Sequence, residues 1–417
     1  MVTDARTHLP PSFNRLAWSN LAAQSAEQIA VAAAPIYTVL ALGGGARETG
    51  LIQTAQTLPL LLFAIPAGML ADRMSRRRLM AYAEALRVVS LIAILALAEL
   101  RLLAWPLLAL LGFIGACGTV AYSVAAPSLV PAIVPPEALA SANSRIELAR
   151  ALAFAAGPAL GGALIGWSGA VSAFGFAAAF SACAVLLLAG LNEPPRPPRP
   201  PRHPLDDIRE GARFVFRHPL LRPVFVTQFL FNTAFFILLA VFVPYAIRSL
   251  DLSASAVGVI LSTYGVGMVV GALLAGRIIR SFRFGICVVI GPIAGLMAAF
   301  VMVLTILIPS PLLAGFSFFL LGAGPIVWVI STTTLRQTVT PPDLLGRVSA
   351  INIMAQGARP IGAGIGAFIG GSFGTELCLV VAAFGFLAQA AVILVSPVLR
   401  LAHQPEMVKY PKHAGSC

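Results

Sequence analysis

Runs of about 20 apolar residues recur along the whole chain, and this recurrence limits the fold more than any other feature. A run of that length crosses a bilayer as an α-helix, whereas a membrane β-barrel shows shorter segments of alternating polarity. The composition agrees, because 59% of the residues are hydrophobic and 11% are charged. A soluble domain carries about 25% charged residues. The sequence therefore predicts an all-α integral membrane protein.

The chain has room for twelve membrane-spanning helices. An even number of spans places both termini on the same side of the membrane. We expect the spans at residues 14–42, 47–71, 77–98, 103–130, 140–168, 170–190, 220–249, 254–280, 284–308, 311–338, 344–371 and 374–400.

The basic residues indicate which side holds the termini. Of the 28 Lys and Arg residues, only Arg47, Arg101 and Arg248 fall in the loops that alternate to the far side. Since cytoplasmic loops carry the excess of Lys and Arg, we expect both termini in the cytoplasm. This placement also accounts for the net charge of +12. The basic loops lack interleaved aromatic residues, so we expect the lipid bilayer and no nucleic acid as a partner.

A proline-rich segment divides the spans into two groups of six. The run from Glu193 to Arg202 alternates Pro and Arg, which favours an extended conformation. The next segment, Asp206 to Arg217, has the pattern of a short amphipathic helix on an anionic lipid surface. We therefore predict a tail at 1–13, a six-helix bundle at 14–192, a linker at 193–219, a second six-helix bundle at 220–400 and a tail at 401–417.

The two bundles resemble copies of one unit. Gly50 and Gly68 correspond to Gly258 and Gly276 at a constant offset, and the segment 135–137 (Pro-Pro-Glu) corresponds to 341–343 (Pro-Pro-Asp). Such pseudo-symmetric halves are typical of secondary transporters, whose binding site lies between the halves near the midplane.

Several classes of protein are excluded. The chain's lysines are Lys409 and Lys412, so no phosphate-binding P-loop can form. The five histidines lie outside the predicted spans, and no pair of cysteines has metal-ligand spacing. We expect neither an enzyme, nor a metal site, nor a cofactor.

Ionisable residues inside a span are costly in hydrocarbon and therefore mark candidate sites. Glu27 lies in the middle of the first span, and Asn20, Gln24 and Glu27 share one helix face. Because burial disfavours the charged form of a carboxyl group, Glu27 is suited to carrying a proton. The alternative is a Glu that only hydrogen-bonds neighbouring helices.

Three further groups are candidates for the same cavity. Glu147 and Arg150 lie one turn apart in the fifth span, where they are suited either to a substrate or proton role or to a simple ion pair. Arg359 is the most deeply placed cation and could pair with an acid or bind an anionic substrate. Gln228 and Asn232 of the seventh span could line the cavity beside it.

Two motifs resemble those of the major facilitator superfamily. Residues 68–77 are similar to the signature of its loop between helices 2 and 3, with Ser75 in place of the second Gly. Gly157-Pro158-x-x-Gly161-Gly162 resembles the helix 5 motif of antiporters, with Ala153 where an upstream Gly is usual. The segments 210–222 and 345–348 are similar to the bacterial branch that includes the enterobactin exporter and macrolide-efflux-like permeases. Because the proline of the helix 5 motif removes a backbone hydrogen bond and its glycines permit bending, we expect a hinge at this motif.

The resemblance also implies a cytoplasmic gate in the loop around residue 72. The second copy has Arg280 where the first has Asp72, so the acid serves more than topology. Asp72 could accept hydrogen bonds from a helix N-terminus and hold the cytoplasmic face closed against helix 11. The alternative is an ion pair within the loop. The predicted gate comprises Gly68, Asp72, Arg73, Arg76, Arg77, Glu84 and Arg87.

These features and the resemblance together predict a proton-coupled exporter of the bacterial inner membrane, expected to be a monomer. It would work by alternating access on small amphipathic molecules such as drugs, siderophores or secondary metabolites. A cavity with few polar groups is unsuited to sugars. The alternatives are an importer or facilitator, a lysolipid flippase, and a membrane sensor that transports nothing.

Overall fold

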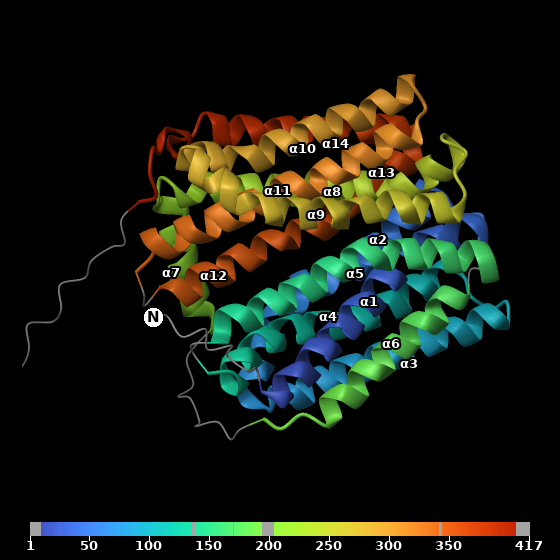
Figure 1. Cartoon of the computed structure of the whole chain (residues 1–417). Helices are drawn as coiled ribbons and strands as arrows, with labels where there is room; N and C mark the ends of the chain where they lie inside the picture. Colours follow the sequence, from blue (N-terminus) through green and yellow to red (C-terminus); the bar gives the residue numbers. More distant parts are fainter. Residues whose placement is uncertain (1–9, 136–137, 170, 194–203, 342–343, 406–417) are drawn as a thin grey trace, which may run out of the picture.

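The computed structural model describes residues 10–135, 138–169, 171–193, 204–341 and 344–405, and these form helices joined by short loops (Figure 1). The first half contains α1 (Pro11–Leu40), α2 (Ala46–Arg73), α3 (Arg76–Glu99), α4 (Trp105–Ile133), α5 (Leu139–Ser168) and α6 (Ser172–Ala189). The second contains α7 (Pro204–Arg217), α8 (Leu221–Arg248), α9 (Ala254–Ser281), α10 (Phe284–Leu307), α11 (Pro311–Val339), α12 (Leu345–Met354), η2 (Ala355–Gly357), α13 (Ala358–Phe373), α14 (Thr375–Leu394) and η3 (Pro397–Arg400).

Within the described ranges, ten helices are long and apolar enough to cross a membrane, namely α2 to α6, α8 to α11 and α14. The first and eleventh predicted spans are not among them. The first, α1, carries a polar stripe that includes Asn20, Gln24 and Glu27. The eleventh is interrupted by the 3₁₀ turn η2, which divides it into α12 and α13. All-helical membrane architecture is therefore confirmed.

The helices run roughly alongside one another, with α1–α6 on one side and α8–α14 on the other (Figure 1). We call the end where α1 begins and α7 lies the near end, and the opposite end the far end. The predicted amphipathic helix is present as α7, but it packs against α12. Gly211 lies directly on the backbone of Arg347, and Arg347 also donates to Glu210. The predicted tails at 1–9 and 406–417 and the linker segment 194–203 lie outside the described residues.

The halves meet along α5 against α9 and α2 against α13, and glycines permit the close approach. A Cβ at Gly50 would lie 2.6 Å from the Cα of Ala367, and a Cβ at Gly258 would lie 2.4 Å from the carbonyl oxygen of Pro158. Small residues let helix backbones approach in this way in lipid. Gly50 and Gly258 are equivalent in the sequence repeat, so the repeat matches symmetric contacts.

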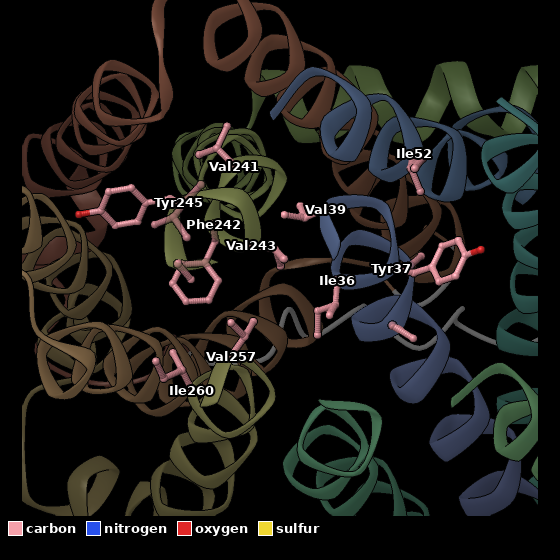
Figure 2. Packing of buried hydrophobic residues seen from close by; sticks show 14 of the residues in the cluster. Ile36, Tyr37, Val39, Ile52, Val241, Phe242, Val243, Tyr245, Val257 and Ile260 are labelled. Carbon is pink, nitrogen blue, oxygen red and sulfur yellow. The ribbon is translucent and has the colours of Figure 1, made fainter. Parts of the chain in front are cut away.

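Among the described residues, one cluster of buried apolar side chains joins the two halves, and it reaches the far end. The largest core cluster includes Ile36 and Val39 of α1 together with Val243 of α8 and Val257 of α9. Figure 2 shows Ile36 and Val39 directed toward Val243. The near end instead contains one cluster in the first half, around Met80, and separate clusters in the second half. The far end is thus packed shut, whereas at the near end each half packs on itself.

Candidate functional site

A cavity of about 470 Å³ lies between the two halves. Its walls come from α1 to α6 on one side and from α8, α9, α11, η2 and α13 on the other. Both halves contribute charged or hydrogen-bonding groups, as expected for a site at the interface of two repeats.

The first-half wall carries most of the polar side chains of the cavity, and α1 supplies several of them. Gln24, Glu27 and Gln28 of α1 face the cavity, together with Gln53 and Gln56 of α2. The Gln56 Oε1 is buried and has no hydrogen-bond partner among the described residues. Asn20, which was predicted on the same face, does not line the cavity. Its side chain is buried, and Nδ2 lies 3.5 Å from the carbonyl oxygen of Ile146.

A buried charge cluster extends from this wall. The Arg87 Nη2 lies 3.8 Å from the Glu27 Oε2, while Arg87 Nη1 donates to both carboxylate oxygens of Glu84, at 2.8 and 3.0 Å. Ser181 of α6 donates a further hydrogen bond to Glu84. Glu84 and Arg87 were assigned by the sequence to the cytoplasmic gate, and the structure corrects this grouping. They lie two to three turns into α3 and extend inward toward Glu27.

The second-half wall carries one cation, Arg359. Its Nε donates to the Asn232 Oδ1 at 3.1 Å, and its guanidinium lies 5.5 Å from the ring centre of Phe236. No carboxylate within the described ranges forms an ion pair with it. Asn232 also lines the cavity, whereas Gln228 lies behind it, because Gln228 accepts from Asn232 through its backbone oxygen at 2.9 Å. The structure therefore brings Glu27 and Arg359 into one cavity from opposite halves.

Aromatic side chains fill much of the same wall. Phe231 stacks on Phe235, Phe235 stacks on Tyr264, and Tyr264 contacts Phe154 from the first half, with ring centres 5.8, 5.5 and 5.9 Å apart. All four rings line the cavity. The sequence prediction missed this row, because nothing in the spacing of the phenylalanines shows which of them face inward.

Glu147 and Arg150 form an ion pair of 2.6 Å at the rim. Arg150 lines the cavity and lies 6.0 Å from the ring centre of Phe154, whereas Glu147 is exposed and not part of the wall. Of the two readings left open by the sequence, the ion pair is therefore observed. A role of Arg150 toward substrate stays a prediction.

The helix 5 motif is a packing surface in this state. A Cβ at Gly157 would lie 2.4 Å from the Cβ of Gln28 in α1. A Cβ at Gly161 would lie 3.2 Å from the carbonyl oxygen of Ile29, also in α1. A Cβ at Gly162 would meet α9. Pro158 lies inside α5, which continues through it as one helix. The glycines of α5 thus lie close to α1 of the first half and to α9 of the second half. The predicted hinge stays a prediction.

The loop between α2 and α3 is fastened to its own half. Glu193, just beyond α6, accepts from the Ser75 hydroxyl at 2.5 Å and from the backbone N–H groups of Arg76 and Arg77 at 3.2 and 3.1 Å. An acid at a helix N-terminus is favourable, and the sequence analysis had expected Asp72 in such a role. The side chain of Asp72 lies outside the described part of the structure.

Three further predicted gate residues are described, namely Gly68, Arg73 and Arg77, and no hydrogen bond or ion pair joins any of them to the described residues of the second half. Arg73 is exposed, and a Cβ at Gly68 would have nothing within 4 Å. The Arg77 guanidinium donates to the carbonyl oxygens of Ala189 and Leu191, at 3.1 and 3.0 Å, so it too stays within the first half.

Comparison with known proteins supports this architecture. The profile of the Major Facilitator Superfamily matches residues 16–359. The enterobactin exporter EntS of Escherichia coli O9:H4 is 29% identical over 364 residues, covering 85% of this chain and 84% of that protein. An uncharacterized MFS-type transporter, y4rN of Sinorhizobium fredii, is 32% identical over 253 residues, covering 57% of this chain and 59% of the relative.

Solved structures of low sequence identity share the fold. A POT family transporter in complex with 5-aminolevulinic acid matches with a TM-score of 0.76 at 12% identity, covering 94% of this chain and 97% of the other. A bacterial homolog of the human lysosomal transporter Spinster, in an inward-facing and unoccupied conformation, matches with a TM-score of 0.70 at 16% identity, covering 94% and 98%. Transporters of low sequence identity to this chain thus share its helix arrangement.

Proposed function

Because the chain belongs to the Major Facilitator Superfamily, we propose that it exports small amphipathic molecules in exchange for protons. It is a membrane transporter and not an enzyme. The exchange would proceed by alternating access, in which the two halves rock about the cavity between them.

The proposed topology has twelve spans, with both termini cytoplasmic, in a monomer of the bacterial inner membrane. Helix α1 has 30 residues, and at 1.5 Å per residue it is long enough to cross a hydrocarbon core of about 30 Å. Helices α12 and α13 with η2 run from 345 to 373 and form the second additional span. The near end would then be the cytoplasmic end, where the arginine-rich loops lie.

The state of the structure is consistent with a cavity open to the cytoplasm. The far end is sealed by the shared cluster around Ile36, Val243 and Val257. It is also tied by polar contacts, since Thr49 donates to the carbonyl oxygen of Ala240 at 2.8 Å and Arg248 donates to that of Gly44 at 2.8 Å. Separation of these contacts would open the far end.

Glu27 carries the proposal of proton coupling. Its side chain is 26% exposed, it faces the cavity between the halves, and its nearest cation lies at 3.8 Å, beyond hydrogen-bond distance. A carboxyl group so placed can reach water from either side and bind a proton without breaking a short ion pair. We assign it the uptake of a proton from the far side and its release to the cytoplasm.

The walls of the cavity favour an amphipathic substrate. The glutamines of the first half offer hydrogen bonds, whereas the row of Phe154, Phe231, Phe235 and Tyr264 offers a flat apolar surface. Drugs, siderophores and secondary metabolites combine both kinds of surface. The relatives named as enterobactin exporters support export as the direction.

The loop between α2 and α3 is proposed as the cytoplasmic gate, with Gly68, Asp72, Arg73, Arg76 and Arg77 as its residues. In the closed state this loop would approach the second half beside α12. In the present state Glu193 holds it within the first half.

Transport in proteoliposomes under an imposed pH gradient tests the proposal. We expect the wild-type protein to drive enterobactin, or a fluorescent amphipathic dye, against the proton gradient. Glu27→Gln should abolish this coupled flux. Glu99→Gln, at an exposed position of α3, is the matched control. Full proton-driven flux in Glu27→Gln would refute the assignment, and flux in the same direction as protons would identify an importer.

A further inference from the structure

The buried pair of Glu84 and Arg87 adjoins the proposed proton site but has no part in the exchange described so far. Glu84 is 0% exposed, and the Arg87 side chain is 6% exposed. Two ionised side chains in the interior of a membrane protein are costly, so their retention calls for a function beyond packing.

We propose that Glu84 is a positioning residue for proton exchange, which holds the Arg87 guanidinium away from full contact with Glu27. This inference rests on the proposed function of Glu27 as the proton carrier. In this proposal Glu84 is not a proton carrier, and the proton is bound and released at the carboxylate oxygens of Glu27.

The hydrogen bonds of Arg87 show how its guanidinium is held. Nη1 donates to both oxygens of Glu84, at 2.8 and 3.0 Å, and to the carbonyl oxygen of Ala23 at 3.1 Å. Nη2 donates to the Thr119 Oγ1 at 2.5 Å. The Glu27 Oε2 lies 3.8 Å from Nη2. At this distance the carboxylate is attracted by the positive charge of Arg87 but forms no short hydrogen bond with it.

Glu84 is in turn fixed from the opposite side. The Ser181 hydroxyl of α6 donates to its Oε2, and this is the same oxygen that accepts from Arg87 at 3.0 Å. Glu84 is therefore clamped between α6 and Arg87, and it cannot follow the motion of a substrate or of water in the cavity. Such full satisfaction is what allows a buried carboxylate to remain charged.

The charge count explains why two acids share one cation. With Glu27 and Glu84 both ionised, the cluster with Arg87 has a net charge of one unit negative, and protonation of Glu27 makes it neutral. Without Glu84, ionised Glu27 and Arg87 would be neutral together, and protonation would leave an unpaired buried cation. Glu84 thus removes a penalty on the protonated form of Glu27.

Other groups around Glu27 do not provide this balance. Among the cavity-lining residues, α5 presents Arg150, α13 presents Arg359, and α4 and α9 present Tyr122 and Tyr264. No hydrogen bond or ion pair joins these four to Glu27 in the described part of the chain. The cavity-lining residues of α2, α6, α8 and α11 carry no charge. Arg150 and Arg359 both favour the ionised form, so the acid that opposes them is Glu84.

The test measures the pH dependence of coupled efflux, of enterobactin or of the amphipathic dye, in proteoliposomes. In Glu84→Gln, Arg87 is free to turn to Glu27 and one negative charge is lost, so both changes favour ionised Glu27. We expect the pH midpoint to move to lower pH by about one unit or more. The double variant Glu84→Gln/Arg87→Gln also lacks Arg87, the cation nearest to Glu27. Its pH midpoint should therefore lie at higher pH than that of the wild-type protein. Glu99→Gln should leave it unchanged.

The outcomes separate this inference from the proposed function. If Glu27→Gln abolishes coupling but Glu84→Gln leaves the midpoint unchanged, Glu27 remains the carrier and the role of Glu84 is refuted. If Glu27→Gln retains coupled flux, the proposed function itself fails. Should Glu84→Gln not insert or fold, Glu84→Asp keeps the charge but withdraws it from Arg87. A smaller shift to lower pH is then expected, and an unchanged midpoint overturns the inference.

Discussion

Substitution of Gly162 by Ala should open the far end of the molecule. A Cβ there would lie 2.5 Å from the carbonyl oxygen of Ala254 and 2.9 Å from the Cα of Gly258. Ordinary contacts are 3.4–4 Å, and the atoms concerned belong to the backbone of α9, so the two helices must separate by about 1 Å. Overpacking of this kind costs about 1–3 kcal/mol.

This cost falls on the state in which the far ends of α5 and α9 are packed together. Ala254 is the first residue of α9, and Gly162 lies within two turns of the end of α5, so both belong to the far end. When the halves part at that end, the clash disappears. A penalty of about 2 kcal/mol therefore lowers the ratio of far-closed to far-open molecules by about 30-fold.

Distances between spin labels at Trp167→Cys and Leu312→Cys, in a variant without native cysteines, measure this ratio. These side chains are 90% and 84% exposed and come from the far ends of α5 and α11, one in each half. We expect Gly162→Ala to increase the population with the longer distance. The matched control is Gly276→Ala, since a Cβ there would meet only the end of the Arg280 side chain, at 3.9 Å. An unchanged distribution, or an equal change in the control, would refute the reasoning.

Two further predictions concern stability. Tyr245→Phe removes a buried hydroxyl that lies 2.8 Å from the Thr305 Oγ1. Because that Oγ1 already donates to the carbonyl oxygen of Met302, the tyrosine is the donor of this hydrogen bond. Loss of the hydrogen bond should cost about 1 kcal/mol of stability and lower Tm by about 1–2 °C. Tyr82→Phe, at an exposed site, should leave Tm unchanged, and an equal loss there would contradict the assignment. Burial lowers the pKa of His218, and its Nδ1 accepts from backbone N–H groups at the start of α8. The unfolded state therefore binds more protons at this residue than the folded state does. As a result, the stability of the fold falls as the pH drops below about 6.5. His218→Asn keeps an acceptor without titrating, and its Tm should fall less between about pH 7.5 and 5.5; equal losses in both proteins would refute this role.

Hydropathy predicted most of the fold because it reports what lipid requires of a helix surface. The predicted span 254–280 is observed as Ala254–Ser281, and the amphipathic helix 206–217 is observed as Pro204–Arg217. The contact of that helix with α12 was not predictable, because Gly211 and Arg347 are distant in sequence. The break at 355–357 was also missed, although Gly357 lies within it and Pro360 follows it.

The charge cluster escaped prediction for a different reason. Glu84 and Arg87 are one turn apart, so the sequence shows that they can pair, but it does not show which way α3 is turned. Their partners Ser181 and Thr119 come from α6 and α4. Position near the arginine-rich loop suggested a gate, whereas the rotation of α3 places both side chains inward.

The charges that face each other across the cavity come from α1, which has a polar stripe, and from α13, which the turn η2 shortens to 16 residues. Helix α1 supplies Glu27 and α13 supplies Arg359, and neither is among the ten apolar helices of the described ranges. A helix enclosed by other helices is released from the requirement for apolar side chains, since its neighbours and the cavity satisfy its polar groups. Helix α1 packs against α5 and α6 and touches α2, α4, α8 and α9, so its polar stripe meets protein and cavity. The weak hydropathy of α1 therefore reflects its enclosed position beside the cavity, where it supplies Glu27.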